Sequence, residues 1–383
     1  TYTGNGGTKV VPHSIGSAPG MIVVKRTDTT GDWVVYHQSV PANCGFLNLT
    51  NSFASAQRFS SVTSSDFTIN VSTADVNASG GTYVAYLFAH DTGTDGLIQC
   101  GSFTTDGSGN ATVTLGWEPQ FNWMKSTDLV DQWYMLDSMR GWPVTTASTK
   151  ILAPNTSGAE TTGTFGNPTA TGFTVANGGA TKTYVYCAVR RPNKPPTTGT
   201  QVYNAIARTG TGAVATVTGV GFAPDLVCVK ARSVPYGNRW TDRMWGAGWA
   251  LTPEDTTAQL DNTTIGVIGL DVMDGARYGA GNPYNNTPET YINHFFKRAP
   301  GVFDVVCRTG TSAANTAVAH SLQAAPEFII AKIRSAAGYD WWCYHSALGQ
   351  DATIALNLTT GVQSSTAYWG SSAHSSSTFY VGN

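Results

Sequence analysis

The sequence predicts an all-β protein made of four tandem β-sandwich-like repeats of about 100 residues, arranged as an elongated array. A motif and the composition carry this prediction. Charged residues make up only 12% of the chain while Gly, Thr, Ser and Asn are abundant, which favours short strands and turns over helices. Four times a proline is followed six residues later by a lysine, with an apolar run between them: Pro19 to Lys25, Pro119 to Lys125, Pro224 to Lys230 and Pro326 to Lys332.

Each proline-to-lysine run is expected to form one strand. Proline cannot donate a ladder hydrogen bond, so it should be the first residue of the strand. The lysine should end the strand, with its stem along the core and its ammonium group in water. A tryptophan follows each lysine after eight to ten residues, and we expect it to belong to the core of the repeat; the four residues are Trp33, Trp133, Trp240 and Trp341.

The ends of the repeats set the expected domain boundaries. Three repeats close on an aromatic strand that begins at Tyr83, Tyr184 or Tyr291, whereas the fourth does not reach such a strand. The first repeat starts in mid-strand, so we expect further chain on both sides. The boundaries are 1–96 for a clipped repeat 1, 97–199 for repeat 2 with a Pro-rich linker at its end, 200–300 for repeat 3 with aromatic loop insertions, and 301–383 for repeat 4. A straight array and a packing in pairs both remain open.

Charge and hydropathy argue against nucleic acid and membranes as partners. The net charge is −2 and the pI is near 6.3, whereas phosphate binding needs a dense basic face. The one basic cluster, Arg190 to Lys194, continues into Pro195 and Pro196 and is interpreted as a linker rather than a binding patch. No apolar run approaches the length of a membrane span.

The cysteines indicate buried thiols rather than a disulfide framework. They show no C-x-x-C spacing and no position that recurs in every repeat, whereas a framework normally repeats with its domain. Zinc is disfavoured because ligand spacing is missing. We therefore predict no metal and no cofactor. The six cysteines are Cys44, Cys100, Cys187, Cys228, Cys307 and Cys343.

The search for catalytic residues predicts no enzyme. His13 and His320 each precede a serine, but neighbours along a strand point to opposite faces and should not meet. The local signatures of common hydrolases, zinc proteases and nucleotide enzymes are missing. A carboxylate pair for glycoside cleavage stays open, since the fold rather than spacing places it. Asp271 and Asp274 are the most loop-like pair, and a solvated turn explains them better.

Repeat 3 carries two aromatic, glycine-rich segments that the other repeats lack, at 235–249 and 274–286. Tryptophan, tyrosine and arginine on such loops are typical of interface hot spots and of platforms that stack on sugars. The candidate ligand or receptor residues are Arg243, Trp245, Arg277, Tyr278 and Tyr284. The alternative is that they fill the core, which for Trp240 is the preferred interpretation.

Several segments together resemble a repeated domain of unknown function found in tail and fibre-like structural proteins of tailed bacteriophages. They are 11–19, the run Gly31 to His37, and the run Asn77 to Ala89 with its closing aromatic strand. The match is close in repeat 1 and in 101–142, looser in repeat 3, and touches nearly the whole chain. The resemblance implies a virion protein and supplies no catalytic residues.

The function expected from this resemblance is that of a non-enzymatic virion structural protein, namely a tail fibre, spike or other appendage in host attachment. Its expected partners are other virion proteins and a host-surface glycan or protein, and its place is the virion surface. Fibres of this kind imply a homo-oligomer, with a trimer expected. Three alternatives stay open: a capsid-surface or decoration fibre, a bacterial extracellular adhesin or carbohydrate-binding protein, and a glycan-degrading tailspike.

Overall fold

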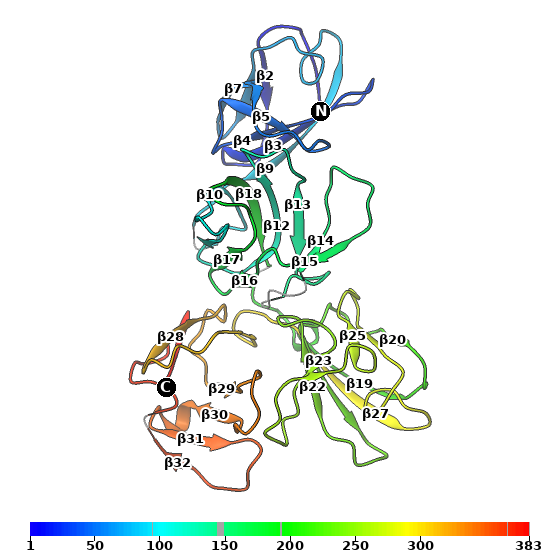
Figure 1. Cartoon of the computed structure of the whole chain (residues 1–383), viewed down its shortest axis with the longest axis vertical. Helices are drawn as coiled ribbons and strands as arrows, with labels where there is room; N and C mark the ends of the chain where they lie inside the picture. Colours follow the sequence, from blue (N-terminus) through cyan, green and yellow to red (C-terminus); the bar gives the residue numbers. More distant parts are fainter. Residues whose placement is uncertain (94, 144–148, 192–193, 366, 383) are drawn as a thin grey trace. The chain divides into compact units, whose positions relative to one another are not determined.

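The computed structural model describes residues 1–93, 95–143, 149–191, 194–365 and 367–382. In these residues the regular elements are β-strands and the short 3₁₀ turns η2 (Gly199–Gln201) and η3 (Ser346–Leu348). The strands form several separate antiparallel sheets (Figure 1). The prediction of an all-β chain is confirmed. None of the described helical turns has the length or the apolar character needed to cross a membrane.

Repeat 1 is a sandwich of a larger and a smaller sheet. Ile22 and Val24 of the larger sheet pack with Phe67 and Ile69 of the smaller sheet in one buried core. The larger sheet contains, in spatial order, β1 (Tyr2–Thr3), β9 (Thr82–Ala89), β3 (Pro19–Arg26), β4 (Trp33–His37), β5 (Asn43–Phe46) and β6 (Ser55–Ala56). The smaller sheet contains β2 (Lys9–Pro12), β8 (Asp66–Ile69) and β7 (Phe59–Val62).

Repeat 2 uses the same strand order. Its larger sheet contains β10 (Ile98–Thr104), β18 (Thr183–Arg190), β12 (Pro119–Ser126) and β13 (Tyr134–Asp137). The smaller sheet contains β11 (Ala111–Thr114), β17 (Gly172–Val175) and β16 (Pro168–Thr169). A hairpin of β14 (Thr149–Ile151) and β15 (Thr161–Gly163) extends the larger sheet through a bridge between Met135 and Leu152.

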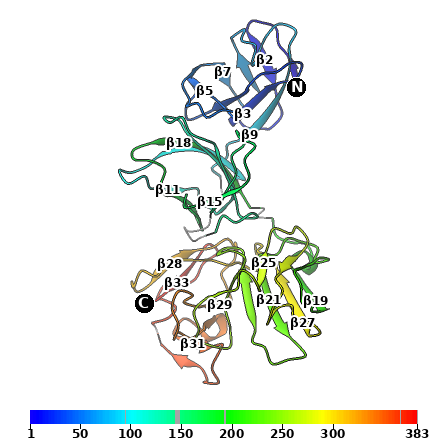
Figure 2. The ribbon, with the colours of Figure 1, turned by 45° about the vertical axis from the view of Figure 1, so that its right-hand side comes forward.

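Repeat 3 repeats the pattern again, and Figure 2 shows its larger sheet. That sheet contains β19 (Tyr203–Thr209), β27 (Thr290–Phe296), β21 (Leu226–Ala231) and β22 (Arg239–Asp242). The smaller sheet contains β20 (Ala215–Val217), β26 (Ala276–Tyr278) and β25 (Val267–Gly269). The hairpin equivalent to β14 and β15 is formed by β23 (Trp249–Ala250) and β24 (Leu260–Asp261).

Repeat 4 lacks one strand of this plan among the described residues. Its larger sheet contains β29 (Phe328–Ala331), β30 (Trp342–His345), β31 (Ala352–Ala355) and β32 (Gln363–Ser364). Its smaller sheet contains only β28 (Thr316–Ala319) and β33 (Thr378–Val381). The closing strands of the first three repeats, β9, β18 and β27, therefore have no counterpart in the described part of repeat 4.

The strand that follows each proline confirms part of the expected pattern. Pro19 and Pro119 are the first residues of β3 and β12, but β21 and β29 begin two residues after Pro224 and Pro326. Proline has no N–H to add to the ladder, so the strand can start at it or just beyond it.

Of the four lysine ammonium groups, that of Lys125 is not in water as expected, whereas those of Lys25 and Lys332 form their bonds at the surface. Each of the four donates a hydrogen bond to a backbone carbonyl in the loop that follows its strand, and Lys125 is completely buried. Burial lowers the pKa of Lys125 to about 8. Each lysine thus fixes the hairpin that leads to the next strand. The bonds run from Lys25 Nζ to Gly31 O, from Lys125 Nζ to Leu129 O at 3.0 Å, from Lys230 Nζ to Tyr236 O at 2.6 Å, and from Lys332 Nζ to Tyr339 O at 2.7 Å.

The repeats associate in pairs. The described residues divide into two compact units, one within Thr1–Ser138 and Thr145–Pro192, the other within Met139–Val144 and Asn193–Asn383. In the first unit the outer faces of the two larger sheets share one buried cluster, in which Met21 and Val23 of repeat 1 pack with Val185 and Cys187 of repeat 2. Since these side chains lie on the face turned away from each repeat's own core, pairing gives each of the two repeats a second apolar contact.

A tryptophan from the second member of each pair completes this contact. Trp133 of repeat 2 is buried and its Nε1 donates to Phe46 O of repeat 1 at 2.8 Å. Trp341 of repeat 4 is also buried, and its Nε1 lies 3.1 Å from Thr252 O and 3.0 Å from Asp255 O of repeat 3. These two tryptophans are buried as expected, but in the contact between repeats rather than in the core of their own repeat, and Trp33 and Trp240 are only half-buried.

His37 makes the contact in the first unit sensitive to pH. It is buried, its Nε2 donates to Tyr186 O at 3.0 Å, and its Nδ1 accepts from Ser39 N at 3.2 Å. Only the neutral ring can make both bonds. Burial, with a smaller contribution from His90, lowers the pKa of His37 to about 4, and the bond to Tyr186 opposes this shift.

We expect the first unit to lose stability as the pH falls from 6.5 to 4, because in this range His37 binds a proton in the unfolded chain but stays neutral in the folded chain. The loss should reach about 3 kcal/mol. Denaturant unfolding between pH 4 and pH 7 measures the free energy of unfolding, and in His37→Gln this free energy should depend less on pH. His345→Gln serves as the control, because His345 occupies the equivalent position in repeat 4 but is exposed. Equal pH dependence in the parent chain and His37→Gln would contradict the assignment.

Candidate functional site

The structure buries most of the residues predicted to contact a ligand. Tyr278 and Tyr284 are 0% exposed and belong to the core of repeat 3, and Arg243 and Trp245 are also buried. Only Arg277 reaches solvent, where it forms an exposed pair with Asp271 at 3.5 Å. Four of the five residues are therefore not a solvent-exposed ligand surface: Tyr278 and Tyr284 fill the core of repeat 3, Trp245 packs in a cluster with Trp341 of repeat 4, and Arg243 is buried among loops.

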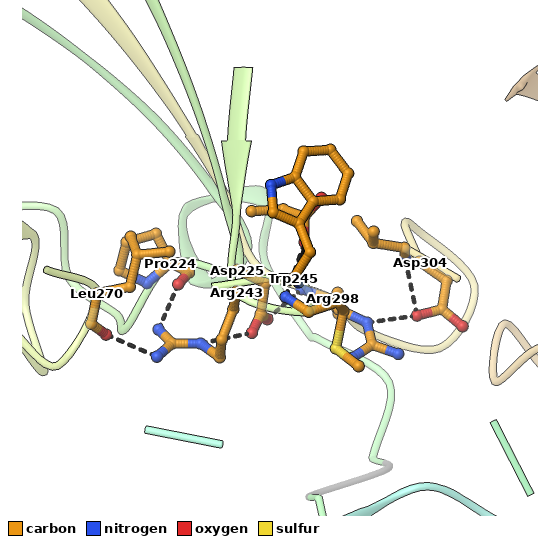
Figure 3. A network of polar contacts seen from close by, with 10 residues as sticks. Pro224, Asp225, Arg243, Trp245, Leu270, Arg298 and Asp304 are labelled. Atoms are coloured by element: carbon orange, nitrogen blue, oxygen red, sulfur yellow. Dashed lines mark hydrogen bonds and ion pairs between the residues drawn. The ribbon is translucent and has the colours of Figure 1, made fainter. Parts of the chain in front are cut away.

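Arg243 instead holds a buried junction between loops of repeat 3 (Figure 3). Its Nε donates to Asp225 Oδ1 at 3.1 Å, its Nη1 to Leu270 O at 2.6 Å, and its Nη2 to Pro224 O. Burial lowers the pKa of Arg243, and Asp225 opposes that shift. Each nitrogen of this guanidinium has an acceptor in its own repeat, so its role is structural.

A second buried ion pair continues this junction into repeat 4. Arg298 N donates to Asp225 Oδ2 at 2.8 Å, and Arg298 Nε donates to Asp304 Oδ1 at 2.6 Å. Asp304 also accepts from the backbone of Val305 at 3.0 Å and of Ser321 at 2.8 Å. The Arg298 and Asp304 side chains are only 2% and 4% exposed. The chain that leaves repeat 3 is thereby fixed to the start of repeat 4.

The strand registers move Trp240 out of the position expected for it. The fourth residue after each proline holds the same position on the central strand, and in repeats 1, 2 and 4 it is Val23, Trp123 or Ile330. Each of these pairs with a residue on the next strand, and the tryptophan lies two residues before that partner, as Trp33, Trp133 or Trp341. In repeat 3 the residue at that central-strand position is Cys228, and its partner on the next strand is Trp240. The residue two before this partner is Asn238, so Asn238 holds the position of the other tryptophans. Trp240 is therefore not the counterpart of the other three tryptophans.

Trp240 lines a depression on the outer face of the larger sheet of repeat 3. Cys228 of β21 pairs with Trp240 of β22 on one side and with His294 of β27 on the other. Paired residues share a face of a sheet, so the small cysteine lies between two rings. The resulting hollow has a volume of about 320 Å³ and is lined by Cys228, Val229, Lys230, Asn238, Trp240, Ile292, His294 and Phe296.

Neighbouring aromatic residues fix the two rings that line this hollow, which we call the Cys228 depression. The Tyr203 ring stacks on His294 with centroids 6.1 Å apart, and the Tyr203 hydroxyl lies 2.8 Å from His294 Nδ1. Trp240 meets Trp341 edge-on with centroids 5.4 Å apart. These contacts leave His294 Nε2 as the ring nitrogen that can face a ligand, and they restrict the movement of both rings.

The polar groups at the Cys228 depression are mostly donors. Lys230 Nζ uses one bond on Tyr236 O, and an ammonium group can donate three. Asn238 Nδ2 lies 3.3 Å from Glu254 Oε2, which positions the amide at the edge. Burial raises the pKa of the Cys228 thiol, so it stays protonated and is a poor nucleophile. The arrangement can stack on a flat or ring-shaped molecule and donate hydrogen bonds to its oxygens.

One family model matches residues 1–191 and 198–383, which together are nearly the whole chain. The chain belongs to the family described as a domain of unknown function (DUF7483). No curated protein and no solved structure matches the chain. Each matched segment of this DUF7483 chain contains two repeats, and the two segments coincide closely with the two compact units.

The outer face that carries the depression in repeat 3 is apolar in the first unit of the DUF7483 chain. The position of Cys228 is taken by Val23 in repeat 1 and by Trp123 in repeat 2, and both belong to the cluster shared between those repeats. Repeat 3 instead places a small thiol there, beside His294 where repeats 1 and 2 have Tyr86 and Cys187. The difference makes this face the best candidate for a ligand site in the described part of the chain.

The sequence analysis placed its candidate residues in repeat 3, which also holds the Cys228 depression, but it did not include Cys228, Asn238 or His294. A signal was present: aligning the four proline-to-lysine runs puts a cysteine where the others have Val, Trp and Ile. The loop residues were favoured because Trp, Tyr and Arg are typical of binding sites. Among the described residues, no group of three His, Cys, Asp or Glu side chains is arranged to hold a metal ion.

Proposed function

We propose that this chain is a non-enzymatic structural protein of a phage virion, part of a tail fibre, spike or other appendage that contacts the host. We further propose that the Cys228 depression binds a host-surface glycan. The observation that carries the proposal is the row formed by Trp240, Cys228 and His294 on a rigid sheet. The resemblance to tail and fibre-like proteins supports the setting, and tandem repeats let one repeat carry a ligand site while the others keep the common scaffold.

A sugar ring suits the chemistry of this face. The flat ring of Trp240 offers an apolar surface to the C–H groups of a pyranose, while Lys230, Asn238 and His294 offer donors to its hydroxyl or carboxylate oxygens. The volume of about 320 Å³ is at the lower end of small-molecule sites, which span about 300–1,000 Å³. The depression thus fits one or two sugar rings at the end of a glycan.

Binding rather than cleavage follows from the lining residues. Glycoside hydrolysis ordinarily uses two carboxyl groups that flank the bond to be broken. None of the eight residues that line the Cys228 depression carries a carboxylate. The protonated Cys228 thiol does not supply a nucleophile in their place.

We expect Cys228→Trp to abolish glycan binding, because it fills the depression with the side chain that repeat 2 carries at the equivalent Trp123. A glycan array identifies the ligand, and titration of that glycan should show affinity at least about tenfold weaker, or 1.4 kcal/mol. Cys228→Ala is the matched control and should bind as the parent does. Equal binding by Cys228→Trp, or no glycan bound by the parent chain, would sink the glycan proposal.

The position in a particle needs a separate experiment. Cryo-electron microscopy of the parent assembly shows where the chain sits and with what symmetry. Density on a tail or baseplate, with the Cys228 depression facing outward, supports host attachment. Density on the capsid shell, or in a bacterial surface filament without a phage particle, removes the tail-appendage proposal and leaves the glycan site to be judged by the binding experiment.

A further inference from the structure

Repeat 2 places two cysteines directly opposite each other on neighbouring strands. Cys100 of β10 pairs with Cys187 of β18 in the antiparallel register of the larger sheet. Paired residues share a face of a sheet, so both side chains lie on the same side. Cysteine is scarce in this chain, with six in 383 residues, and the six are free thiols in this structure. In repeat 3 the equivalent pair is Ala205 with His294, so the facing thiols distinguish repeat 2 from repeat 3.

The hydrogen-bond pattern makes Cys100 and Cys187 the closer kind of cross-strand pair. In an antiparallel ladder, facing residues that do not bond each other through the backbone have Cα atoms about 4.5 Å apart, against about 5.5 Å for bonded pairs. Cys100 N donates to His90 Nδ1 at 3.1 Å and Cys100 O accepts from Gln38 Nε2, so both groups point away from β18. A disulfide joins Cα atoms about 4.4–6.8 Å apart. The backbone therefore holds the two cysteines at a separation that a disulfide can span.

The two thiols also contact each other. A hydrogen bond between the Cys100 and Cys187 side chains, together with burial, raises the pKa of the Cys100 thiol. The thiolate is the form that reacts with a disulfide, so the folded chain offers little of the reactive form of Cys100. The register already opposes the two side chains, and joining the sulfur atoms requires no shift of β10 along β18.

The contact with repeat 1 covers both thiols. Cys100 is 0% exposed and Cys187 is 1% exposed, and both belong to the cluster that repeats 1 and 2 share. A Cβ atom on Gly20 of β3 would lie 2.9 Å from Cys100 Sγ, so the backbone of repeat 1 passes directly over this sulfur. A dissolved oxidant or reductant therefore reaches the pair only when the two repeats have separated.

We propose that Cys100 and Cys187 form a disulfide when the chain folds in an oxidising environment, and that the bond fixes β10 to β18 before repeat 1 covers them. Virion and cell surfaces are environments in which disulfides persist. Among the described residues β10 is the edge strand of its sheet and pairs there with β18 alone. A bond between residues so far apart in sequence restricts the unfolded chain strongly. This site is independent of the Cys228 depression and of its ligand.

The oxidant that we assign is a small-molecule disulfide. One cysteine thiolate attacks a sulfur of that molecule, which forms a mixed disulfide and releases one small thiolate. The second cysteine thiolate attacks the cysteine sulfur of the mixed disulfide, which forms the bond between Cys100 and Cys187 and releases the second small thiolate. The two cysteines thus lose two electrons to the small-molecule disulfide, and their two protons pass to the two small thiols.

The test refolds the 383-residue chain from denaturant in oxidised glutathione and, separately, in reduced glutathione. Free thiols are then alkylated, and the chain is digested with trypsin without reductant. Trypsin cleaves after lysine and arginine, which places Cys100 in the peptide 59–125 and Cys187 in the peptide 183–190, each with no other cysteine. Mass spectrometry of the oxidised sample should show these two peptides joined, with the mass of two hydrogen atoms lost.

The stability of the first unit gives the second measurement. Its thermal midpoint should be at least about 5 °C higher in the oxidised chain than in the reduced chain. Cys187→Ala keeps a small apolar side chain but removes the bond, so its midpoint should be the same in both buffers. Cys228→Ala is the matched control, because Cys228 faces Trp240 and His294 rather than a cysteine, and it should keep the linked peptides.

Three results would overturn the proposal. The first is alkylation of both Cys100 and Cys187 in the oxidised sample, which would show that they remain thiols. The second is a link from either residue to a different cysteine. The third is a chain that carries the bond but is no more stable than the reduced chain, because the bond would then not hold β10 to β18.

Discussion

Asp304→Ala should destabilise the second unit by about 3–5 kcal/mol, because it leaves the buried Arg298 guanidinium without its carboxylate partner. Both side chains are nearly inaccessible to solvent, and the change also removes the acceptor for the backbone of Val305 and Ser321. Unfolding in guanidinium chloride gives the free energy of unfolding of the second unit. Hydrogen exchange shows whether the affected transition belongs to residues 194–382.

The control is a second ion pair of the same unit. Arg277 and Asp271 lie 3.5 Å apart with side chains 43% and 47% exposed. Exposed pairs contribute about 0–1 kcal/mol, so Arg277→Ala should change the unfolding free energy by no more than that. If Asp304→Ala and Arg277→Ala cost the same, the Arg298–Asp304 pair does not hold repeat 4 to repeat 3.

Trp133→Ala should cost the first unit about 3–5 kcal/mol, since it empties a fully buried indole site. The same change leaves Phe46 O without the donor that bonds it at 2.8 Å, and removes the ring that packs against Phe53 with centroids 6.0 Å apart. The measured quantity is the free energy of unfolding of the first unit, with limited proteolysis between the two repeats as a second readout.

Trp33 gives the matched comparison, because it occupies the same strand position in repeat 1 and is only half-buried. Trp33→Ala should therefore cost clearly less than Trp133→Ala. Trp133→Phe keeps part of the apolar contact and loses the hydrogen bond, so it should fall between them. Equal costs for Trp33→Ala and Trp133→Ala would show that the buried contact between repeats adds nothing beyond each repeat's own fold.

The central strands could be predicted from the sequence because they depend on residues that are close together in the chain. The proline, the apolar run and the lysine act within a few residues, and β3 and β12 begin where proline predicts. The tyrosines at the second position of the closing strands β9, β18 and β27 are also local signals. The lysine contacts could not be predicted, because their acceptors are backbone carbonyls and every residue type has one. The acceptors belong to Gly31, Leu129, Tyr236 and Tyr339.

The candidate face was harder to predict because the exposure of its side chains is set by the neighbouring repeat. Trp123 and Cys228 stand at the same position, yet one is packed in a shared cluster and the other lies in a depression. Arg243 and Tyr284 have the composition of a ligand site, but the acceptors around Arg243 and the Asn262 bond to the Tyr284 hydroxyl come from distant loops. Residue type alone therefore did not show which of these side chains stay exposed.

The buried tryptophans Trp133 and Trp341 bear on how such chains grow and shrink in evolution. Each inserts into the preceding repeat of its own pair, so deleting or duplicating one repeat exposes an indole or the surface that receives it. Duplication of a whole pair carries no such penalty. Viable length variants should therefore differ by two repeats, and recombination should fall between pairs, which is where the two family segments of this chain meet.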